Sequence, residues 1–77
     1  MRMKVIEINF ASNLPWLFRL IDSTGVEYFV LNAEKYAEFG VASPVTRLML
    51  DNFDIGTSIQ ASSKEWNGAN IVTVIAR

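Results

Sequence analysis

The chain contains serines and carboxylates, which could act as nucleophiles or general bases, but it contains no histidine and no cysteine. A serine nucleophile needs a neighbouring base that takes its proton, and the sequence offers neither a histidine nor a serine–lysine motif. Zinc, iron and copper sites are built mainly from cysteine and histidine. The sequence therefore predicts a protein that is not an enzyme and that holds no metal ion or other cofactor.

The net charge of the chain does not favour binding to nucleic acid or to anionic lipid. Seven basic and eight acidic residues leave a formal net charge of -1, so general attraction to nucleic acid or anionic lipid is not supplied by net charge. Nucleic-acid binding would have to rely on stacking or on a local patch. Five of the cations are spread along the chain, and only the fold could gather them: Lys4, Arg19, Lys35, Arg47 and Lys64.

Hydrophobic alternation and turn residues predict the elements that would position these side chains. Asn32 is a residue type that often caps the start of a helix, and Gly40 is one that often follows a helix end. Ser43-Pro44 is typical of the start of a second helix. Asn67-Gly68 is typical of a two-residue type I′ hairpin turn. The expected strands are 4–10, 16–21, 26–31, 57–64 and 71–75, with a helix over 33–39 and a segment 45–50 that fits a short helix or an extended strand.

Charged residues predict which faces of the two aromatic strands are buried. Arg19 and Glu27 are expected to face solvent, because such side chains are rarely buried without a partner. Their neighbours Trp16, Phe18 and Leu20, with Tyr28 and Val30, are then expected to face the core, and Phe29 becomes an exposed aromatic. In the first strand, Lys4, Ile6, Ile8 and Phe10 are expected on one face and Val5, Glu7 and Asn9 on the other.

These elements favour a mainly β fold, in which residues 1–77 form one domain. A small five-stranded antiparallel barrel with a short helical insertion between its third and fourth strands accommodates all of them. An SH3-like barrel is the alternative. No stretch reaches the roughly 18 apolar residues of a membrane-spanning helix, no signal peptide is apparent, and the lack of cysteine fits a cytoplasmic protein.

Several motifs resemble the cold-shock domain family. Ile8-Asn9-Phe10 followed by 14–20, Leu-Pro-Trp-Leu-Phe-Arg-Leu, is similar to that family's first strand and its lysine-glycine-phenylalanine-glycine-phenylalanine motif. Residues 27–31, Glu-Tyr-Phe-Val-Leu, resemble its valine-phenylalanine-valine-histidine motif. The resemblance implies an oligonucleotide/oligosaccharide-binding barrel, the OB-fold. It also implies that unpaired bases stack on Trp16, Phe18 and Phe29.

The candidate nucleic-acid-binding residues are therefore Lys4, Trp16, Phe18, Arg19, Phe29 and Trp66. These assignments contain one conflict. If Trp16 and Phe18 face solvent, regular alternation turns Arg19 inward, unless a bulge intervenes. The alternative is that Trp16 and Phe18 fill the core, and that Trp66 packs across its hairpin instead of anchoring a ligand.

Two functions remain open from the sequence. The first is weak binding of single-stranded DNA or RNA through the aromatic hairpin. The second is a protein-interaction or assembly module, which self-associates or binds a protein partner without binding nucleic acid. For the second, an apolar patch is expected from Phe29, Leu31, Met49 and Phe53. No membrane partner is expected.

Overall fold

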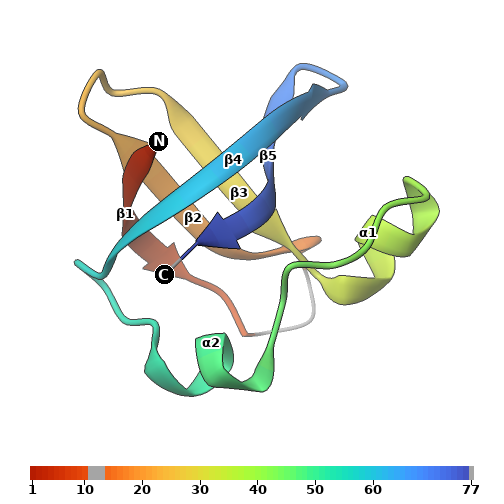
Figure 1. Ribbon diagram of the computed structural model, residues 1–77, viewed down its shortest axis with the longest axis horizontal. Coiled ribbons are helices and arrows are strands. Elements are labelled where there is room, and N and C mark those ends of the chain that lie inside the picture. The colour runs from red at the N-terminus through yellow and green to blue at the C-terminus, as the bar shows by residue number, and fades with distance from the viewer. Residues whose placement is uncertain (11–13, 77) are drawn as a thin grey trace.

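In the computed structural model, which describes residues 1–10 and 14–76, five strands close into a barrel (Figure 1). The strand order around the barrel is β1-β2-β3-β5-β4. The elements are β1 (Arg2–Ile8), β2 (Trp16–Asp22), β3 (Glu27–Leu31), α1 (Ala33–Glu38), α2 (Arg47–Asn52), β4 (Ser58–Trp66) and β5 (Ala69–Ala76). The predicted mainly β class and the helical insertion between the third and fourth strands are confirmed, and the insertion contains two helices.

The prediction of a purely antiparallel sheet is wrong at one seam. Strands β3 and β5 run parallel and are joined through a single residue pair, Phe29 with Ile71, whereas the other four neighbouring pairs are antiparallel. The reason is topological. In a ring with an odd number of strands the direction cannot alternate at every step, so at least one neighbouring pair must be parallel.

Strand β1 departs from the predicted alternation because its register shifts between Val5 and Glu7. Val5 is fully buried, and Ile8 also packs against the core cluster. Glu7 is exposed and lies opposite Arg19 on β2. A bulge adds one residue to a strand and reverses the facing of the residues after it. Val5 and Glu7 therefore face opposite sides, contrary to the prediction of regular alternation.

Strand β2 has a second register shift, between Trp16 and Phe18. Phe18 and Leu20 are fully buried in the barrel core, as predicted, and Leu17 packs against the same cluster. Trp16 pairs with Leu31 and belongs to a different cluster, outside the barrel. The predicted inward orientation is right for Phe18 and Leu20 and wrong for Trp16, because the extra residue at Leu17 changes the face.

The turn between β2 and β3 is organised by the carboxylate of Asp22. One oxygen accepts hydrogen bonds from the backbone N–H and the hydroxyl of Thr24, at 2.8 and 2.6 Å, and from the backbone N–H of Val26 at 3.1 Å. The other oxygen accepts from the Tyr28 hydroxyl at 2.7 Å. Gly25 completes the turn with a φ of 89°, a conformation that suits glycine.

These hydrogen bonds predict a dependence of stability on acidity. The bonds from Thr24 and then Tyr28 lower the pKa of Asp22 from 3.8 to about 2. A lowered pKa in the folded state stabilises the fold above the ordinary pKa, and this contribution is lost as the pH falls toward the folded value. We expect the free energy of unfolding, measured with urea, to fall between about pH 4 and pH 2. This fall should shrink in Asp22→Asn and persist in the control Asp51→Asn; an equal fall in all three proteins would contradict the assignment.

The hairpin between β4 and β5 confirms the Asn67-Gly68 prediction. Trp66 pairs with Ala69 across a two-residue loop, and both loop residues have positive φ, 52° and 81°, as a type I′ turn requires. In β4, Ile59 and Ala61 face the core and alternate with exposed polar residues. The outer face of this strand is therefore polar.

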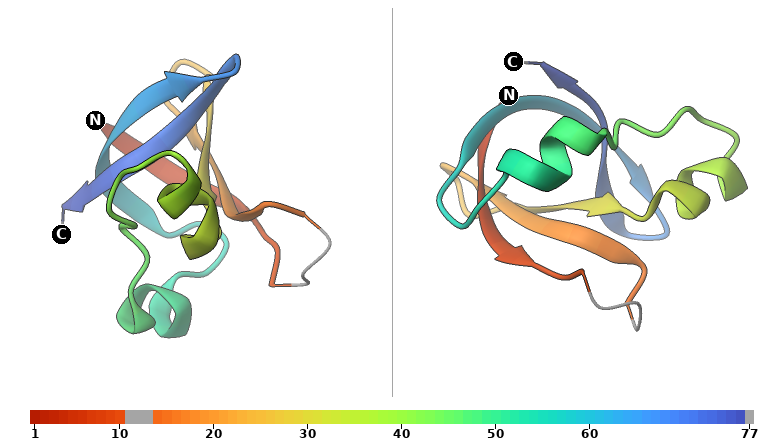
Figure 2. Two further views of the ribbon diagram at one scale, coloured as in Figure 1. Left: turned by 90° about the vertical axis from the view of Figure 1, so that its right-hand side faces the viewer. Right: turned by 90° about the horizontal axis from the view of Figure 1, so that it is seen from below.

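Helix α2 closes one end of the barrel (Figure 2). It begins after Thr46, whose hydroxyl accepts from the backbone N–H of Met49, rather than at the predicted Ser43-Pro44. Met49 and Phe53 are buried in the barrel core, and the rings of Phe53 and Phe18 have centroids 5.5 Å apart. The end of the barrel is thus filled by apolar side chains.

Helix α1 lies beside β3 and β5 (Figure 1). It follows Asn32, but the predicted side-chain cap by Asn32 is not formed. Instead the Asn32 amide donates to the carbonyl of Leu14. Tyr36 of α1 is fully buried. Its hydroxyl donates to the carbonyl of Val72 and accepts from the backbone N–H of Leu31. Tyr36 thus bridges β3 and β5 next to their single direct pair.

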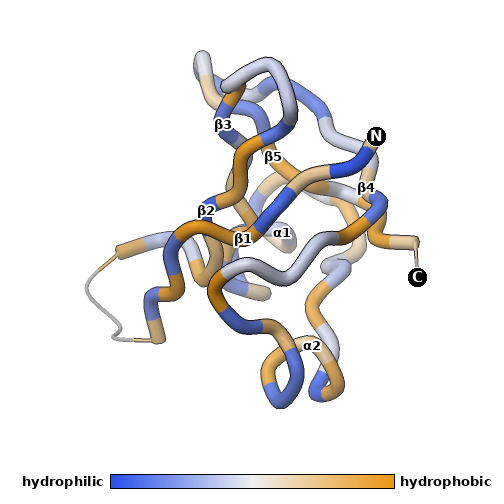
Figure 3. Tube along the Cα trace, turned by 90° about the vertical axis from the view of Figure 1, so that its left-hand side faces the viewer, coloured by the Kyte–Doolittle hydropathy of each residue, from blue (hydrophilic) through white to orange (hydrophobic). Residues whose placement is uncertain are grey.

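Hydrophobic and hydrophilic residues interchange along β1 and β2 (Figure 3), as expected for strands with one face on a core. Neither α1 nor α2, the helices of the described residues, has the length and hydrophobicity that crossing a bilayer requires.

Candidate nucleic-acid interface

One row of side chains runs around the outside of the barrel, because residues paired across neighbouring strands share a face. Val5, Phe18 and Val30 face the core, so the row beside them faces outward. We call this set the outer row, and it consists of Glu7 on β1, Arg19 on β2, Phe29 on β3, Ile71 on β5 and Lys64 on β4. This row around the barrel thus holds two cations on non-adjacent strands, Arg19 on β2 and Lys64 on β4, and one aromatic ring, Phe29, next to Arg19.

Trp16 joins Phe29 on this face. Their ring centroids lie 5.9 Å apart with an interplanar angle of 55°. The bulge that turns Trp16 outward is held by Asn9, whose side-chain amide donates to the Trp16 carbonyl at 3.2 Å and whose backbone N–H donates to the Leu17 carbonyl at 2.8 Å. Both rings are half-buried, because they also pack against the cluster of Leu31, Tyr36 and Ile71.

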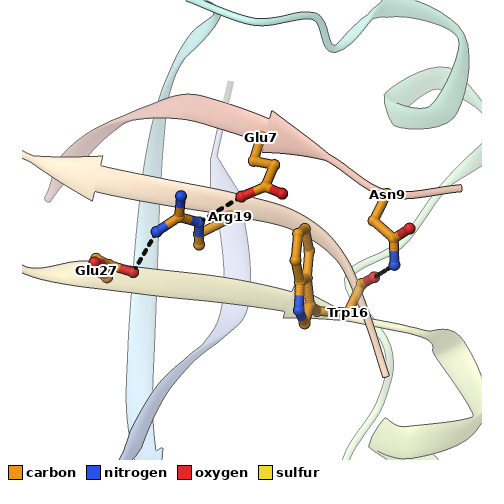
Figure 4. A network of polar contacts seen from close by, with 5 residues as sticks. All are labelled: Glu7, Asn9, Trp16, Arg19 and Glu27. Carbon is orange, nitrogen blue, oxygen red and sulfur yellow. Dashed lines mark hydrogen bonds and ion pairs between the residues drawn. The ribbon is translucent and has the colours of Figure 1, made fainter. Parts of the chain in front are cut away.

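Arg19 lies between two glutamates on the outer face, with Trp16 further along the same strand (Figure 4). Its guanidinium contacts Glu27 at 2.8 Å and Glu7 at 2.9 Å. These hydrogen bonds, the one to Glu27 first, raise the pKa of Arg19. Two carboxylates and one guanidinium leave this group of three with one net negative charge.

Trp66 lies at the end of β4 and stacks on Phe39, which follows α1. The two rings are nearly parallel, with centroids 4.4 Å apart and an angle of 7°. Trp66 also packs against the cluster of Leu31, Tyr36 and Ile71. The Trp66 ring thus packs on protein and remains half-exposed.

The structure brings most of the predicted site residues to the outer surface. Trp16, Arg19 and Phe29 lie together, and Trp66 lies on the other side of Ile71. Lys4 is exposed and pairs with Ile21, which in turn pairs with Glu27, so it lies in the row next to the outer row. Phe18 is the exception. Its side chain is fully buried, so the prediction that a base stacks on it is wrong.

The apolar patch expected for an assembly module is not present as predicted. Leu31 is covered by the packing of Trp16 and Tyr36, and Met49 and Phe53 fill the barrel end. Phe39 was not among the predicted site residues, and it retains 36% exposure. The signal in the sequence that could have identified Phe39 was its position as an aromatic residue directly before Gly40, at the end of the predicted helix.

Half-buried aromatic rings offer faces for stacking, and two cations lie on the same strands as the tryptophans, Arg19 with Trp16 on β2 and Lys64 with Trp66 on β4. Across residues 1–10 and 14–76, no three side chains of the histidine, cysteine, aspartate and glutamate types are grouped to hold a metal ion.

Fold and surface together define a small five-stranded β-barrel protein with half-exposed aromatic residues on its outer face. No protein-family model, no curated protein and no solved structure matches this chain.

Proposed function

We propose that this protein binds single-stranded nucleic acid weakly through the outer face that carries Trp16, Phe29 and Trp66, and that its barrel is of the OB type. The observation that carries the proposal is the bulge at Leu17. It puts Trp16 on the face of Arg19 and Phe29, while Phe18 still fills the core. Stacking residues and a cation on one barrel face are what single-strand binding requires.

The strand order supports an OB-type barrel. Such barrels have five strands in a partly open Greek-key arrangement and bind oligonucleotides on the strand β2–β3 face and the adjoining loops. The order β1-β2-β3-β5-β4 and the helical insertion after β3 fit this layout. The resemblance of β2 and β3 to the cold-shock motifs points to the same strands.

The charges on the face predict low affinity. Glu7 and Glu27 satisfy the guanidinium of Arg19, so a phosphate must compete with two carboxylates for it. The chain has a formal net charge of -1 and adds no long-range attraction. Stacking therefore carries most of the binding, at about 1–3 kcal/mol per base.

Fluorescence titration with an oligothymidylate tests the proposal, since Trp16 and Trp66 are intrinsic reporters on the binding face. We expect salt-sensitive quenching in the range of tens of micromolar, a rough figure for a few stacked bases and few phosphate contacts. Phe29→Ala should weaken binding about tenfold, because one stacking ring is lost. Phe10→Ala removes an aromatic that is 57% exposed and lines a different groove, and it should bind like the unmodified protein.

A gain of binding provides a second readout. The double variant Glu7→Gln, Glu27→Gln removes both carboxylates from Arg19 and should tighten binding and steepen its salt dependence. The proposal fails if the unmodified protein shows no salt-sensitive quenching, or if Phe29→Ala binds as tightly as Phe10→Ala.

A protein partner is the second candidate, and one observation favours it. Phe10, Leu48 and Leu50 are exposed large hydrophobic residues, and a groove of about 490 Å³ runs between Phe10, Leu17, Val45 and Leu50. Exposed apolar grooves of this kind are typical of interaction sites. Light scattering across a concentration series separates self-association from a monomer.

A further inference from the structure

A second concave site lies on β1, away from the aromatic rings. It has a volume of about 540 Å³, within the range of small-molecule sites. We call it the β1 pocket. Its walls come from β1 and the end of β2, from the turn that follows β2, and from the start of β4, and they include Arg2, Met3, Lys4, Ile21, Asp22 and Ser58.

Two cations stand on the same side of β1. Arg2 and Lys4 are two positions apart on a strand and therefore share a face, and both are exposed. Ser58 of β4 lies opposite Lys4, so its hydroxyl is close to the Lys4 stem. Among the described residues, ion pairs engage Arg19, Lys35 and Arg47 with carboxylates, and none engages Arg2 or Lys4.

The carboxylate in the lining, Asp22, is already engaged. It accepts hydrogen bonds from Thr24, Val26 and Tyr28, which spread its charge over the turn. The β1 pocket thus combines two available cations with one satisfied carboxylate. This balance favours an anion, and a doubly charged phosphate matches two cations better than a carboxylate does.

The rest of the lining includes the apolar side chains of Met1 and Ile21 and the hydroxyl groups of Ser58 and the β2–β3 turn. The Met3 side chain faces the barrel core instead. A ligand that matches this lining has a charged group, an apolar part and polar groups. A nucleoside monophosphate has this composition: a dianionic phosphate, a sugar with hydroxyls, and a base.

We propose that the β1 pocket binds the phosphate of a nucleoside monophosphate, with the phosphate on Arg2 and Lys4 and the base on Ile21. The nucleotide is either free or the phosphorylated end of a strand; the strand-end version rests on the proposed function, whereas the free-nucleotide version does not. In the strand-end version, Lys4 lies one row of residues from the outer row, so a strand on the aromatic face can reach the pocket.

The test is a backbone-amide NMR titration with adenosine 5′-monophosphate, adenosine and inorganic phosphate as separate probes. The expected result is a saturable shift of the Lys4, Ile21 and Ser58 amides with the monophosphate, and weaker binding of adenosine and of phosphate. The double variant Arg2→Gln, Lys4→Gln should weaken the monophosphate at least about tenfold, because charged hydrogen bonds are lost. The matched double variant Lys35→Gln, Arg47→Gln removes the same charge elsewhere and should change nothing.

Two further measurements distinguish a free nucleotide from the phosphorylated end of a strand as the ligand. They are binding of oligothymidylates with and without a 5′-phosphate, and binding of the monophosphate to Phe29→Ala. A strand-end site predicts that the 5′-phosphate tightens oligonucleotide binding, and that Arg2→Gln, Lys4→Gln abolishes this gain. A free-nucleotide site predicts monophosphate binding that Phe29→Ala leaves intact, even if no oligonucleotide binds. The proposal is overturned if monophosphate shifts fall outside the pocket, or if both double variants bind it equally.

Discussion

Replacement of Phe18 by alanine is expected to lower the free energy of unfolding by about 3–5 kcal/mol, the usual range for a fully buried phenylalanine. Phe18 is 0% exposed, and its ring makes edge contacts with Phe10 and Phe53, at centroid distances of 5.8 and 5.5 Å. The substitution leaves a cavity between the sheet and the residues that fill the barrel end. In a domain of this size such a loss approaches the whole stability, so urea unfolding monitored by Trp16 and Trp66 fluorescence is the measurement.

Two other phenylalanines provide the comparison. Phe10→Ala and Phe29→Ala remove an exposed ring and a half-buried ring, and each should cost less than Phe18→Ala. The comparison also separates core from binding surface, because Phe29→Ala is the variant expected to lose nucleic acid. If Phe18→Ala were as stable as Phe10→Ala, the assignment of Phe18 to the core would be wrong.

Replacement of Tyr36 by phenylalanine is expected to cost about 2–4 kcal/mol, although it removes a single oxygen atom, because it strips two buried backbone groups of their partner. The Tyr36 hydroxyl links the Leu31 N–H to the Val72 carbonyl at the parallel seam, where one direct residue pair joins β3 and β5. Tyr28→Phe is the matched control. It also loses a hydroxyl, but Asp22 keeps its bonds from Thr24 and Val26, so about 1 kcal/mol is expected.

The same residue should make the fold sensitive to alkali. Burial raises the pKa of Tyr36 from 10.0 to about 12. A raised folded pKa gives stability that is complete below the unfolded pKa and is lost as the pH rises through the folded value. The free energy of unfolding should therefore fall between about pH 10 and pH 12, and the fall should be smaller in Tyr36→Phe. An identical alkaline fall in that variant would show that the Tyr36 hydroxyl is not buried at the seam.

The bulges decide what the outer face can do, and they explain why periodicity failed to place the site residues. Regular alternation required Trp16 and Phe18 to share a face, with Arg19 on the other. With one extra residue at Leu17, Phe18 stays in the core while Trp16 reaches the face of Arg19 and Phe29. A bulge costs one unpaired residue, and nothing in the local residue types marks its position, so periodicity alone could not locate it.

The ion pairs of Arg19 with Glu7 and Glu27 could not be predicted from the sequence either, because they also depend on a bulge and on strand register. Alternation put Glu7 on the face of Val5, which is buried, and the bulge between them moves Glu7 opposite Arg19. Glu27 reaches the guanidinium from β3 across the sheet. The charge of the candidate interface therefore depends on register between strands, and register was not readable from any single strand.

The sequence by itself determined how many strands form and where they lie along the chain, the helical insertion and the Asn67-Gly68 hairpin. The reason is that alternation and turn chemistry act within a few residues. The parallel seam, in principle, followed from five strands in a closed ring. Only the tertiary structure decided that Tyr36 bridges that seam, that Trp16 faces outward and that Arg2 and Lys4 border a pocket. These features depend on which residues from distant segments meet, and such contacts are set by register and packing of the whole barrel rather than by local preference.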